Sequence, residues 1–385
     1  MLRVQKKIHT LPKSQARRAW LHAQRLDVPA PFGSGPEATR SAVEHLGYVQ
    51  IDTINVIERC HHHILYSRIP DYARKHLHQA QSVDKSVFEY WTHALSYVPA
   101  RDVRYFLNTM KRYKQNPGRW FESVKEKDLR RVLRLIRKEG ALSIRDIEDD
   151  ELVEKDHPWA SRKPSKRALQ LGFFTGQLTI SERVGMLKTY DLMDRHFGWE
   201  QRPKPASERQ ILDYLLDRAL RSQGIVSLDS TCHLDAKRKP GIRQLIERRM
   251  RRKELVAVEI DGAEKVEHWA RPEALEAIPT PVEDMVHILS PFDPLIIRRR
   301  RLKLLFDYEH RFEAYVPKEK RVFGYFALPV LVGENVVAAI DLKTDREARK
   351  LLVRQWTWVG GGKPRLHKKL IEEALHRFER FQLGT

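Results

Sequence analysis

Cysteine is scarce in this chain of 385 residues, and several catalytic and membrane motifs are missing altogether. Cys60 and Cys232 are too few for a disulfide framework, and they do not form a CxxC metal pair. No apolar run of 18 residues could cross a bilayer, and Gly360-Gly361-Gly362 lacks the Lys-Ser/Thr of a P-loop. The nucleophilic serine turn of hydrolases and the zinc-protease motif are also absent. These absences argue against a disulfide-rich domain, a transmembrane protein and the common hydrolase and NTPase classes.

Acidic residues are also few relative to basic ones. The chain has 71 Lys and Arg against 51 Asp and Glu, which gives a net charge of +20. Such an excess indicates a polyanionic partner, most simply double-stranded DNA. An anionic membrane surface is the rival interpretation, but no polybasic tail stands beside a lipidation motif. The start of the chain lacks the apolar core of a secretion signal, so we expect a cytoplasmic, nucleoid-associated protein that does not bind membranes.

What the chain does contain is a repeated order of elements, which predicts an α+β fold of several domains. Within residues 123–204 we expect a helix at 128–138, a short strand at 141–144 and a second helix that begins at Ser143 or Asp146. A basic helix at 166–176 and a hairpin at 177–190 should follow. Within residues 205–280 the same order returns, at 208–224, 225–227, 231–236, 240–252 and 255–269. This order is typical of winged helices, and residues 1–122 could form a third.

The pattern changes after Ala277, where alternating residues replace helical periodicity. Strands are predicted at residues 312–316, 322–332, 336–342 and 351–359, and a final helix at 364–381. Residues 281–385 are therefore expected to form an antiparallel sheet or small β-barrel with a terminal helix.

Two polar residues, Gln50 and Asp52, flank Ile51 in the segment 46–54, which is rich in β-branched and aromatic residues. On a strand, alternate side chains share a face, so Gln50 and Asp52 should project together while Val49 and Ile51 pack inward. An amide beside a carboxylate can position a water molecule and accept its proton. The alternative is a strand with one solvated face.

Basic residues on the two expected basic helices are candidate phosphate contacts: Lys166, Arg167, Arg243 and Arg248. A solvated basic face is the alternative for any one of them. Farther along the chain, Arg298 to Arg301 follow a run of turn formers. Consecutive side chains cannot all face one way, so we expect Arg298 and Arg300 to reach DNA while the others pair with acids such as Asp307 or Glu309.

Histidines cluster at Cys60-His61-His62-His63, but adjacent residues splay apart and lack the spacing of a metal site. No metal or cofactor is expected. A packed or exposed histidine cluster is one interpretation, and contact of His62 with substrate or phosphate is the other. His93 follows the aromatic run 88–91, which we interpret as a helix. Core packing is the alternative for Tyr90 and Trp91, whereas His93 could form one wall of a pocket around Asp52.

Together these residues resemble the bacterial winged-helix alkylpurine DNA glycosylases of the AlkZ/YcaQ type. The resemblance is carried by residues 49–57, Leu65-Tyr66-Ser67-Arg68, and residues 88–94, 164–169, 289–295 and 320–329. It implies three tandem winged-helix domains at 1–122, 123–204 and 205–280, followed by a C-terminal antiparallel β-barrel at 281–385. It also implies catalytic roles for Gln50 and Asp52 and a substrate-binding role for Arg68. Where the family usually has Ala-His-Glu-Ala, this chain has Thr92-His93-Ala94-Leu95, so a carboxylate is missing.

The Gln-apolar-Asp motif resembles the branch that removes N7-alkylguanine and unhooks interstrand crosslinks. The resemblance therefore implies a monofunctional glycosylase whose partner is duplex DNA with alkylated or crosslinked purines. Two rivals explain the charge and the repeats without catalysis: a winged-helix DNA-binding regulator and an architectural factor that recognises distorted DNA. A regulator would be expected to dimerise on paired half-sites, whereas no heptad run is present, which favours a monomer.

Overall fold

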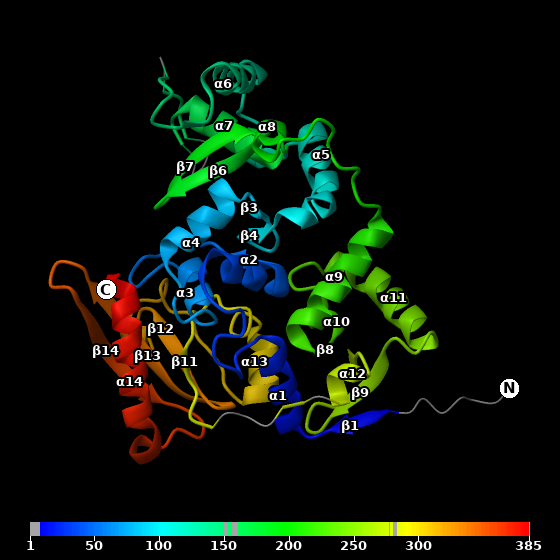
Figure 1. The fold of residues 1–385 in the computed structure, drawn as a ribbon, viewed down its shortest axis with the longest axis vertical. Helices are drawn as coiled ribbons and strands as arrows, with labels where there is room; N and C mark the ends of the chain where they lie inside the picture. Colours follow the sequence, from blue (N-terminus) through cyan, green and yellow to red (C-terminus); the bar gives the residue numbers. More distant parts are fainter. Residues whose placement is uncertain (1–7, 150–151, 156–160, 277, 280–282, 385) are drawn as a thin grey trace. The chain divides into compact units, whose positions relative to one another are not determined.

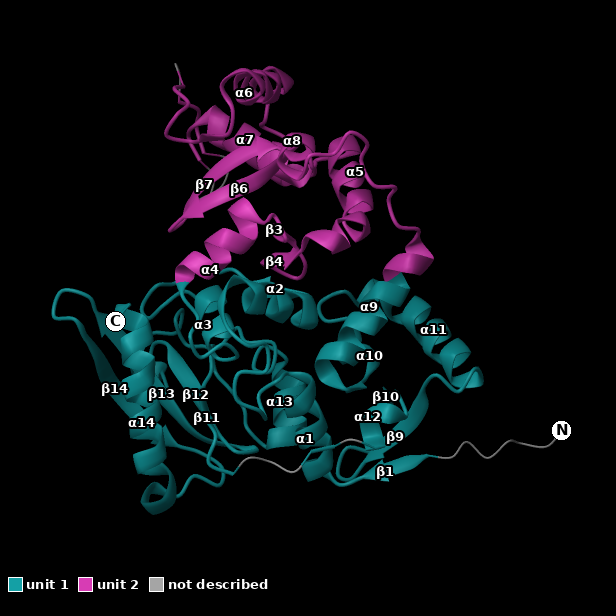
Figure 2. Ribbon diagram, viewed as in Figure 1, with its two compact units in different colours: residues 1–73, 212–385 teal, residues 74–211 magenta. Residues whose placement is uncertain are grey.

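A computed structural model describes residues 8–149, 152–155, 161–276, 278–279 and 283–384 (Figure 1). The chain forms a mixed α+β structure that divides into two compact units (Figure 2). Unit 1 contains residues 1–73 and 212–385, and unit 2 contains residues 74–211. Because this division places the start and the end of the chain in one unit, it does not resolve the four domains expected from the sequence. Those boundaries remain a prediction.

Unit 1 contains a four-stranded sheet that joins the start of the chain to its third quarter. The sheet has the order β1-β9-β10-β8. β1 lies parallel to β9, whereas β10 is antiparallel to both β9 and β8. The strands span His9–Leu11 (β1), Ile225–Val226 (β8), Val256–Ile260 (β9) and His268–Ala270 (β10). The helices between β1 and residue 66 are α1 (Lys13–Ala23), α2 (Gly35–Leu46) and α3 (Cys60–Tyr66), and α12 (Glu273–Glu276) follows β10.

The elements expected between residues 205 and 280 are mostly confirmed. They are α9 (Glu208–Gln223), β8, α10 (Leu228–Thr231), α11 (Lys239–Arg251) and the β9–β10 hairpin. The boundary between the two units falls within α9. The helix expected at 231–236 is instead α10, capped by Ser227, and a 3-10 turn at Ala236–Arg238. In α11 the apolar residues Ile242, Leu245 and Ile246 are buried, as their spacing predicts.

The C-terminal part of unit 1 is an antiparallel sheet in the order β11-β12-β13-β14, and one helix packs on it. The elements are β11 (Val286–Ile288), β12 (Ala327–Val332), β13 (Asn335–Asp345), β14 (Lys350–Trp358) and α14 (Pro364–Leu383), with α13 (Arg299–Phe306) preceding β12. The strand expected at 312–316 was wrong, because Glu313 there accepts hydrogen bonds from the N–H groups of Val322 and Phe323 and so closes a loop. The expected barrel is not confirmed, since the sheet is open at β11 and β14 in the described residues.

Unit 2 contains a helical pair and a three-stranded sheet in the order β5-β7-β6. Its elements after residue 106 are α5 (Leu107–Gln115), α6 (Glu126–Glu139), β5 (Leu142–Ser143), α7 (Pro164–Phe174), β6 (Leu178–Val184), β7 (Leu187–Leu192) and α8 (Met193–Phe197). These positions confirm the expected helices, short strand and hairpin. No helix begins at Ser143 or Asp146 in the described residues, because the Asp146 carboxylate accepts hydrogen bonds from the N–H and hydroxyl of Ser143 and forms a turn.

Before α5, unit 2 contains α4 (Arg74–His78), a π-helical turn at Gln79–Val83 and the hairpin of β3 (Val87–Trp91) and β4 (Leu95–Pro99). The aromatic helix expected around His93 was therefore wrong, and His93 lies in the hairpin turn. Val87, Phe88 and Tyr90 are buried in the strand, where β-branched and aromatic side chains pack well. Glu89 is also buried and forms an ion pair with Arg183 on β6.

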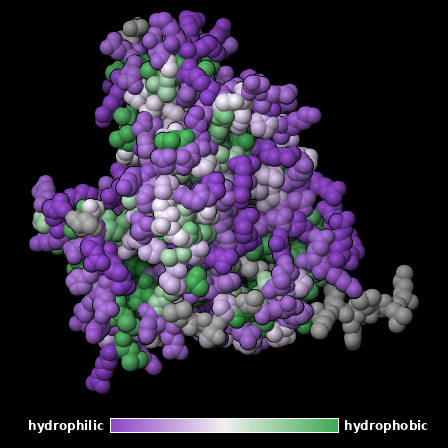
Figure 3. Space-filling model, viewed as in Figure 1, coloured by the Kyte–Doolittle hydropathy of each residue, from purple (hydrophilic) through white to green (hydrophobic). Residues whose placement is uncertain are grey.

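Hydrophilic side chains cover most of the face in Figure 3. No helix among the described residues is long and apolar enough to cross a membrane.

Candidate active site

The segment that carries Gln50 and Asp52 follows α2 through Gly47, which ends that helix in the left-handed conformation with φ of 78°. A Cβ atom at Gly47 would lie 2.4 Å from Cδ of Arg218. The backbone conformation favours glycine, and a Cβ atom would also force the Arg218 side chain to move. The same Arg218 guanidinium stands 5.5 Å from the ring centre of Tyr48. Gly47 and Tyr48, which precede the motif of Gln50 and Asp52, thus pack against Arg218 of α9.

The strand expected over residues 46–54 is reduced to β2, at Val49–Gln50. Beyond it, residues 51–55 have no regular structure because Asp52 Oδ1 accepts a hydrogen bond of 2.8 Å from the Ile54 N–H. This turn competes with strand pairing. Strand alternation consequently fails here, since Gln50 and Ile51 are both buried, with 7% and 6% of their surfaces exposed. The predicted strand is therefore present only at β2, and the shared orientation of the two polar side chains stays a prediction, with Asp52 half-exposed.

A buried thiol supports the motif from behind. Cys60, at the start of α3, donates a hydrogen bond of 3.0 Å to the backbone oxygen of Gln50. Burial raises the pKa of Cys60 well above its usual value, and the nearby Asp52 charge raises it further. The thiol therefore stays protonated and remains a donor. Sequence spacing gave no sign of this role, because ten residues separate the two positions.

The segment after Asp52 is fastened to the C-terminal sheet and to α14. Arg346 donates hydrogen bonds to the backbone oxygen and side-chain oxygen of Asn55, at 3.1 and 2.9 Å. The Thr344 N–H donates to the Val56 oxygen at 2.9 Å. Gln382 Oε1 accepts from the Glu58 N–H at 2.6 Å and from the Thr344 hydroxyl at 3.1 Å. Side chains far apart in the sequence thus hold one short stretch of backbone.

The three histidines of α3 have different surroundings. His61 and His63 are buried, whereas His62 is half-buried and its Nδ1 lies 2.6 Å from the Tyr72 hydroxyl. His63 Nε2 lies 2.7 Å from the Ile288 oxygen, and burial lowers the pKa of His63 to about 4. In the described residues, no group of three His, Cys, Asp or Glu side chains could hold a metal ion. The substrate contact expected of His62 remains a prediction.

Arg68 does not fit the expected role in binding DNA or substrate. Its side chain is fully buried and forms a two-point ion pair with Asp293, with distances of 2.7 and 3.1 Å. The same guanidinium donates to the oxygens of Gln24 and Ile64. An arginine with all its donors engaged inside the protein cannot reach a phosphate without disrupting the fold. The prediction for Arg68 is corrected to a structural role.

In the run Arg298 to Arg301, the exposed and buried side chains differ from those predicted. Arg298 is buried and donates to the Ser230 oxygen, so it is not available to DNA, while Arg300 is exposed. The acids expected to pair with the run instead bind lysines: Asp307 pairs with Lys13 and Glu309 with Lys303. Arg298 and Arg301 are buried and each donates to one backbone oxygen, of Ser230 and Ile225, because the run enters α13, which turns consecutive residues to different faces.

The remaining candidates lie on both units. In unit 2, Lys166 is exposed, Arg167 is buried, and His93 is half-buried with Nδ1 at 3.4 Å from the Thr92 hydroxyl. The burial of Arg167 argues against a direct phosphate contact. In unit 1, both Arg243 and Arg248 are half-exposed on α11. The structure adds that Arg243 already forms a two-point ion pair with Glu267.

Fold and site together define a basic, mixed α+β protein in which one irregular segment presents a carboxylate beside a buried amide. Comparison with known proteins identifies the class as DNA glycosylases. A family model described as DNA glycosylase AlkZ-like matches residues 43–381, and the chain belongs to this AlkZ-like family. Five solved chains are similar to it. One is the Streptomyces sahachiroi DNA glycosylase AlkZ, with 16% identity, a TM-score of 0.63 and coverage of 97% of each chain. At that identity the likeness establishes the fold alone.

Proposed function

We propose that the chain is a monofunctional DNA glycosylase that hydrolyses the N-glycosidic bond of N7-alkylguanine and unhooks interstrand crosslinks. Family membership supports the glycosylase activity. The net charge of +20 suits a duplex DNA substrate. The observation that carries the catalytic assignment is the Asp52 carboxylate, which is half-exposed and held by its own backbone turn.

The reaction needs a base for water more than it needs an acid. Guanine alkylated at N7 carries a positive charge, so the bond from C1′ to N9 breaks with the electron pair moving to the base. The base leaves neutral, and the sugar develops oxocarbenium character, as in glycoside hydrolysis. Asp52 Oδ1 is used by the Ile54 N–H, while Oδ2 accepts no hydrogen bond from the described residues. We assign Oδ2 the proton of the attacking water, which leaves a hydroxyl at C1′ and an abasic site.

Gln50 is assigned the orientation of that water. Its side chain is buried and lies two residues before Asp52, whose carboxylate is half-exposed. A base tied across the duplex cannot rotate fully into a closed pocket. The half-exposed carboxylate is consistent with a site that acts on a base which remains near the duplex.

We also propose that the chain acts as a monomer in the cytoplasm and retains the domain order inferred from the sequence. The helix, strand, helix and hairpin order at 126–192 and 208–270 supports two of the three winged helices. Lys166, Arg243, Arg248 and Arg300 remain proposed DNA contacts, with His62 and His93 as proposed substrate contacts.

The test is release of base from duplex DNA that contains N7-methylguanine or a nitrogen-mustard crosslink, measured as abasic sites under single-turnover conditions. Asp52→Asn keeps an oxygen that can accept from the Ile54 N–H, so the turn should persist while the general base is lost. We expect a fall in rate of about 100-fold or more, with DNA affinity unchanged. The matched control is Asp261→Asn, which removes an exposed carboxylate in the β9–β10 turn. Absence of product from the wild type would favour the non-catalytic regulator, and full activity of Asp52→Asn would exclude the mechanism.

A further inference from the structure

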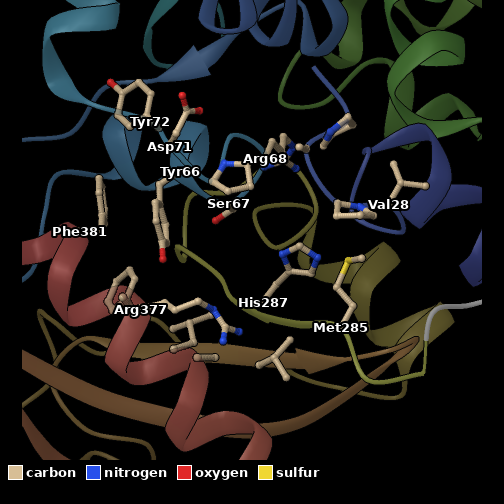
Figure 4. Close-up of a pocket in the computed structure, with 18 of the residues that line it drawn as sticks. Val28, Tyr66, Ser67, Arg68, Asp71, Tyr72, Met285, His287, Arg377 and Phe381 are labelled. Atoms are coloured by element: carbon tan, nitrogen blue, oxygen red, sulfur yellow. The ribbon is translucent and has the colours of Figure 1, made fainter. Parts of the chain in front are cut away.

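Unit 1 contains a concave site whose lining does not include Gln50 or Asp52. It has a volume of about 510 Å³, within the range of small-ligand sites. Four segments line it: residues 28–31, residues 66–72, β11 with the two residues before it, and the C-terminal half of α14. All of these segments belong to unit 1. Figure 4 shows Tyr66 and Phe381 on one side of the space, and Met285 and Val28 on the other.

One wall of this cavity is aromatic. The rings of Tyr66 and Phe381 stack with centroids 4.1 Å apart and an interplanar angle of 8°. Phe378 packs at 5.9 Å from Tyr66, and Tyr72 at 6.3 Å from Phe381. Tyr66 and Phe381 are both only half-buried, so part of this wall is open to a ligand. Such a surface suits a planar ring, because aromatic side chains bind nucleobases through their faces and edges.

The second feature is the charge beside that wall. Arg377 and Arg380 are exposed on α14, and Arg377 extends into the cavity in Figure 4. Burial raises the pKa of the Tyr66 hydroxyl, but both guanidinium groups act in the opposite direction, which places them near this ring. Arg68 also lines the cavity, although Asp293 already neutralises it.

Two carboxylates limit how negative the ligand can be. Asp71 and Asp284 line the same cavity and balance the formal charges of Arg377 and Arg380. A ligand with several phosphates would meet these carboxylates, whereas a single phosphate can lie against the arginines of α14 alone. Arginine suits this contact because its planar donors match phosphate oxygens.

We propose that this cavity binds one nucleotide unit, with the base against the wall of Tyr66 and Phe381 and the phosphate on Arg377 and Arg380. The unit comes either from a DNA strand or from a free mononucleotide. The single charge of a phosphodiester favours the strand. Only this choice of source rests on the proposed function, since the chemistry of the cavity does not depend on glycosylase activity.

The experiment uses the full chain and a trinucleotide with 2-aminopurine at its centre, whose fluorescence falls when the base stacks. The wild type should quench the probe saturably. Arg377→Gln should weaken binding about three- to tenfold and reduce the dependence of log affinity on log salt by about 0.7. The matched control is Arg365→Gln, which removes an exposed charge from the same helix outside the cavity and should change affinity less than twofold. Phe381→Leu should remove most of the quenching.

Competition with dGMP shows whether the site binds a free mononucleotide or a nucleotide of a DNA strand. Displacement of the trinucleotide by dGMP at comparable concentration indicates a free nucleotide, and weak displacement indicates a strand. The proposal is overturned if no saturable binding occurs, or if Arg365→Gln weakens binding as much as Arg377→Gln. Base release is measured in parallel with the same proteins. Probe binding without base release would reject the proposed glycosylase function and support the nucleotide site. Base release without probe binding would support the glycosylase function and reject the nucleotide site.

Discussion

The thiol of Cys60 donates a hydrogen bond of 3.0 Å to the backbone oxygen of Gln50, and so joins the start of α3 to the segment that carries Gln50 and Asp52. Cys60→Ala removes this donor, and loss of the hydrogen bond should cost about 0.5–1.5 kcal/mol of stability. We also expect a several-fold lower rate of base release, because the motif loses its support. Cys60→Ser keeps a donor and should lie between alanine and the wild type.

Cys232→Ala is the matched control, because Cys232 is also buried and packs in the cluster that contains Ile242 and Leu245 of α11. It should lower the denaturation midpoint without changing the single-turnover rate. A Cys60→Ala protein with the rate of the wild type would show that the thiol contributes to packing alone.

A second prediction concerns Arg346, which holds Asn55 through two hydrogen bonds. Arg346→Gln should lower the rate constant for base release about two- to tenfold, because the segment after Asp52 becomes less well ordered. DNA affinity should change little. Arg349→Gln is the control, since Arg349 is an exposed cation in the same β13–β14 turn. Equal losses of affinity in both variants, with unchanged rates, would instead indicate that this turn binds DNA.

The ion pair of Arg68 and Asp293 gives a third prediction. Arg68→Ala leaves a buried carboxylate without its partner, and breaking a buried pair in this way costs about 3–5 kcal/mol. Urea denaturation followed by circular dichroism should show a much lower midpoint. Arg300→Ala, which removes an exposed arginine, should stay within about 0.5 kcal/mol of the wild type. An Arg68→Ala protein of normal stability but weak DNA binding would restore the role first expected from the sequence.

Sequence patterns were sufficient to predict the longer helices. The helices α6, α9, α11 and α14 were predicted because each has an apolar stripe at helical spacing and a clear end. The run 88–91 was misassigned because a short apolar run does not distinguish a strand from a helix. The run forms a strand because β3 pairs with β4 in an antiparallel hairpin.

The site was predicted less completely than the fold. Gln50 and Asp52 stood out as polar residues in an apolar segment, but the turn at Asp52 depends on one local hydrogen bond that strand alternation ignores. The contacts of Arg68 with Asp293 and of Gln382 with Glu58 span 225 and 324 residues. Pairings at such separations have no local signature, so an arginine in the sequence looks the same whether it binds phosphate or a buried carboxylate.

The last prediction concerns pH. His63 and His287 are held as neutral side chains, and burial lowers the pKa of each to about 4. Their Nε2 atoms lie 2.7 and 2.9 Å from the backbone oxygens of Ile288 and Leu26, so each ring donates from Nε2. Unfolded histidine binds a proton below pH of about 6.5, whereas these two stay neutral until about pH 4. Stability should therefore be level above pH of about 6.5 and should fall as the pH decreases, by up to about 1.4 kcal/mol per pH unit for each histidine.

The measurement is the urea denaturation free energy between pH 7.5 and pH 5. His63→Gln removes one titrating group, so its slope against pH should be smaller than that of the wild type by about one proton, whatever its absolute stability. His376→Gln removes an exposed histidine of α14 and should leave the slope unchanged. A wild-type free energy that stays constant from pH 6.5 to pH 5 would contradict the prediction, because the unfolded chain would then gain no more protons than the folded one.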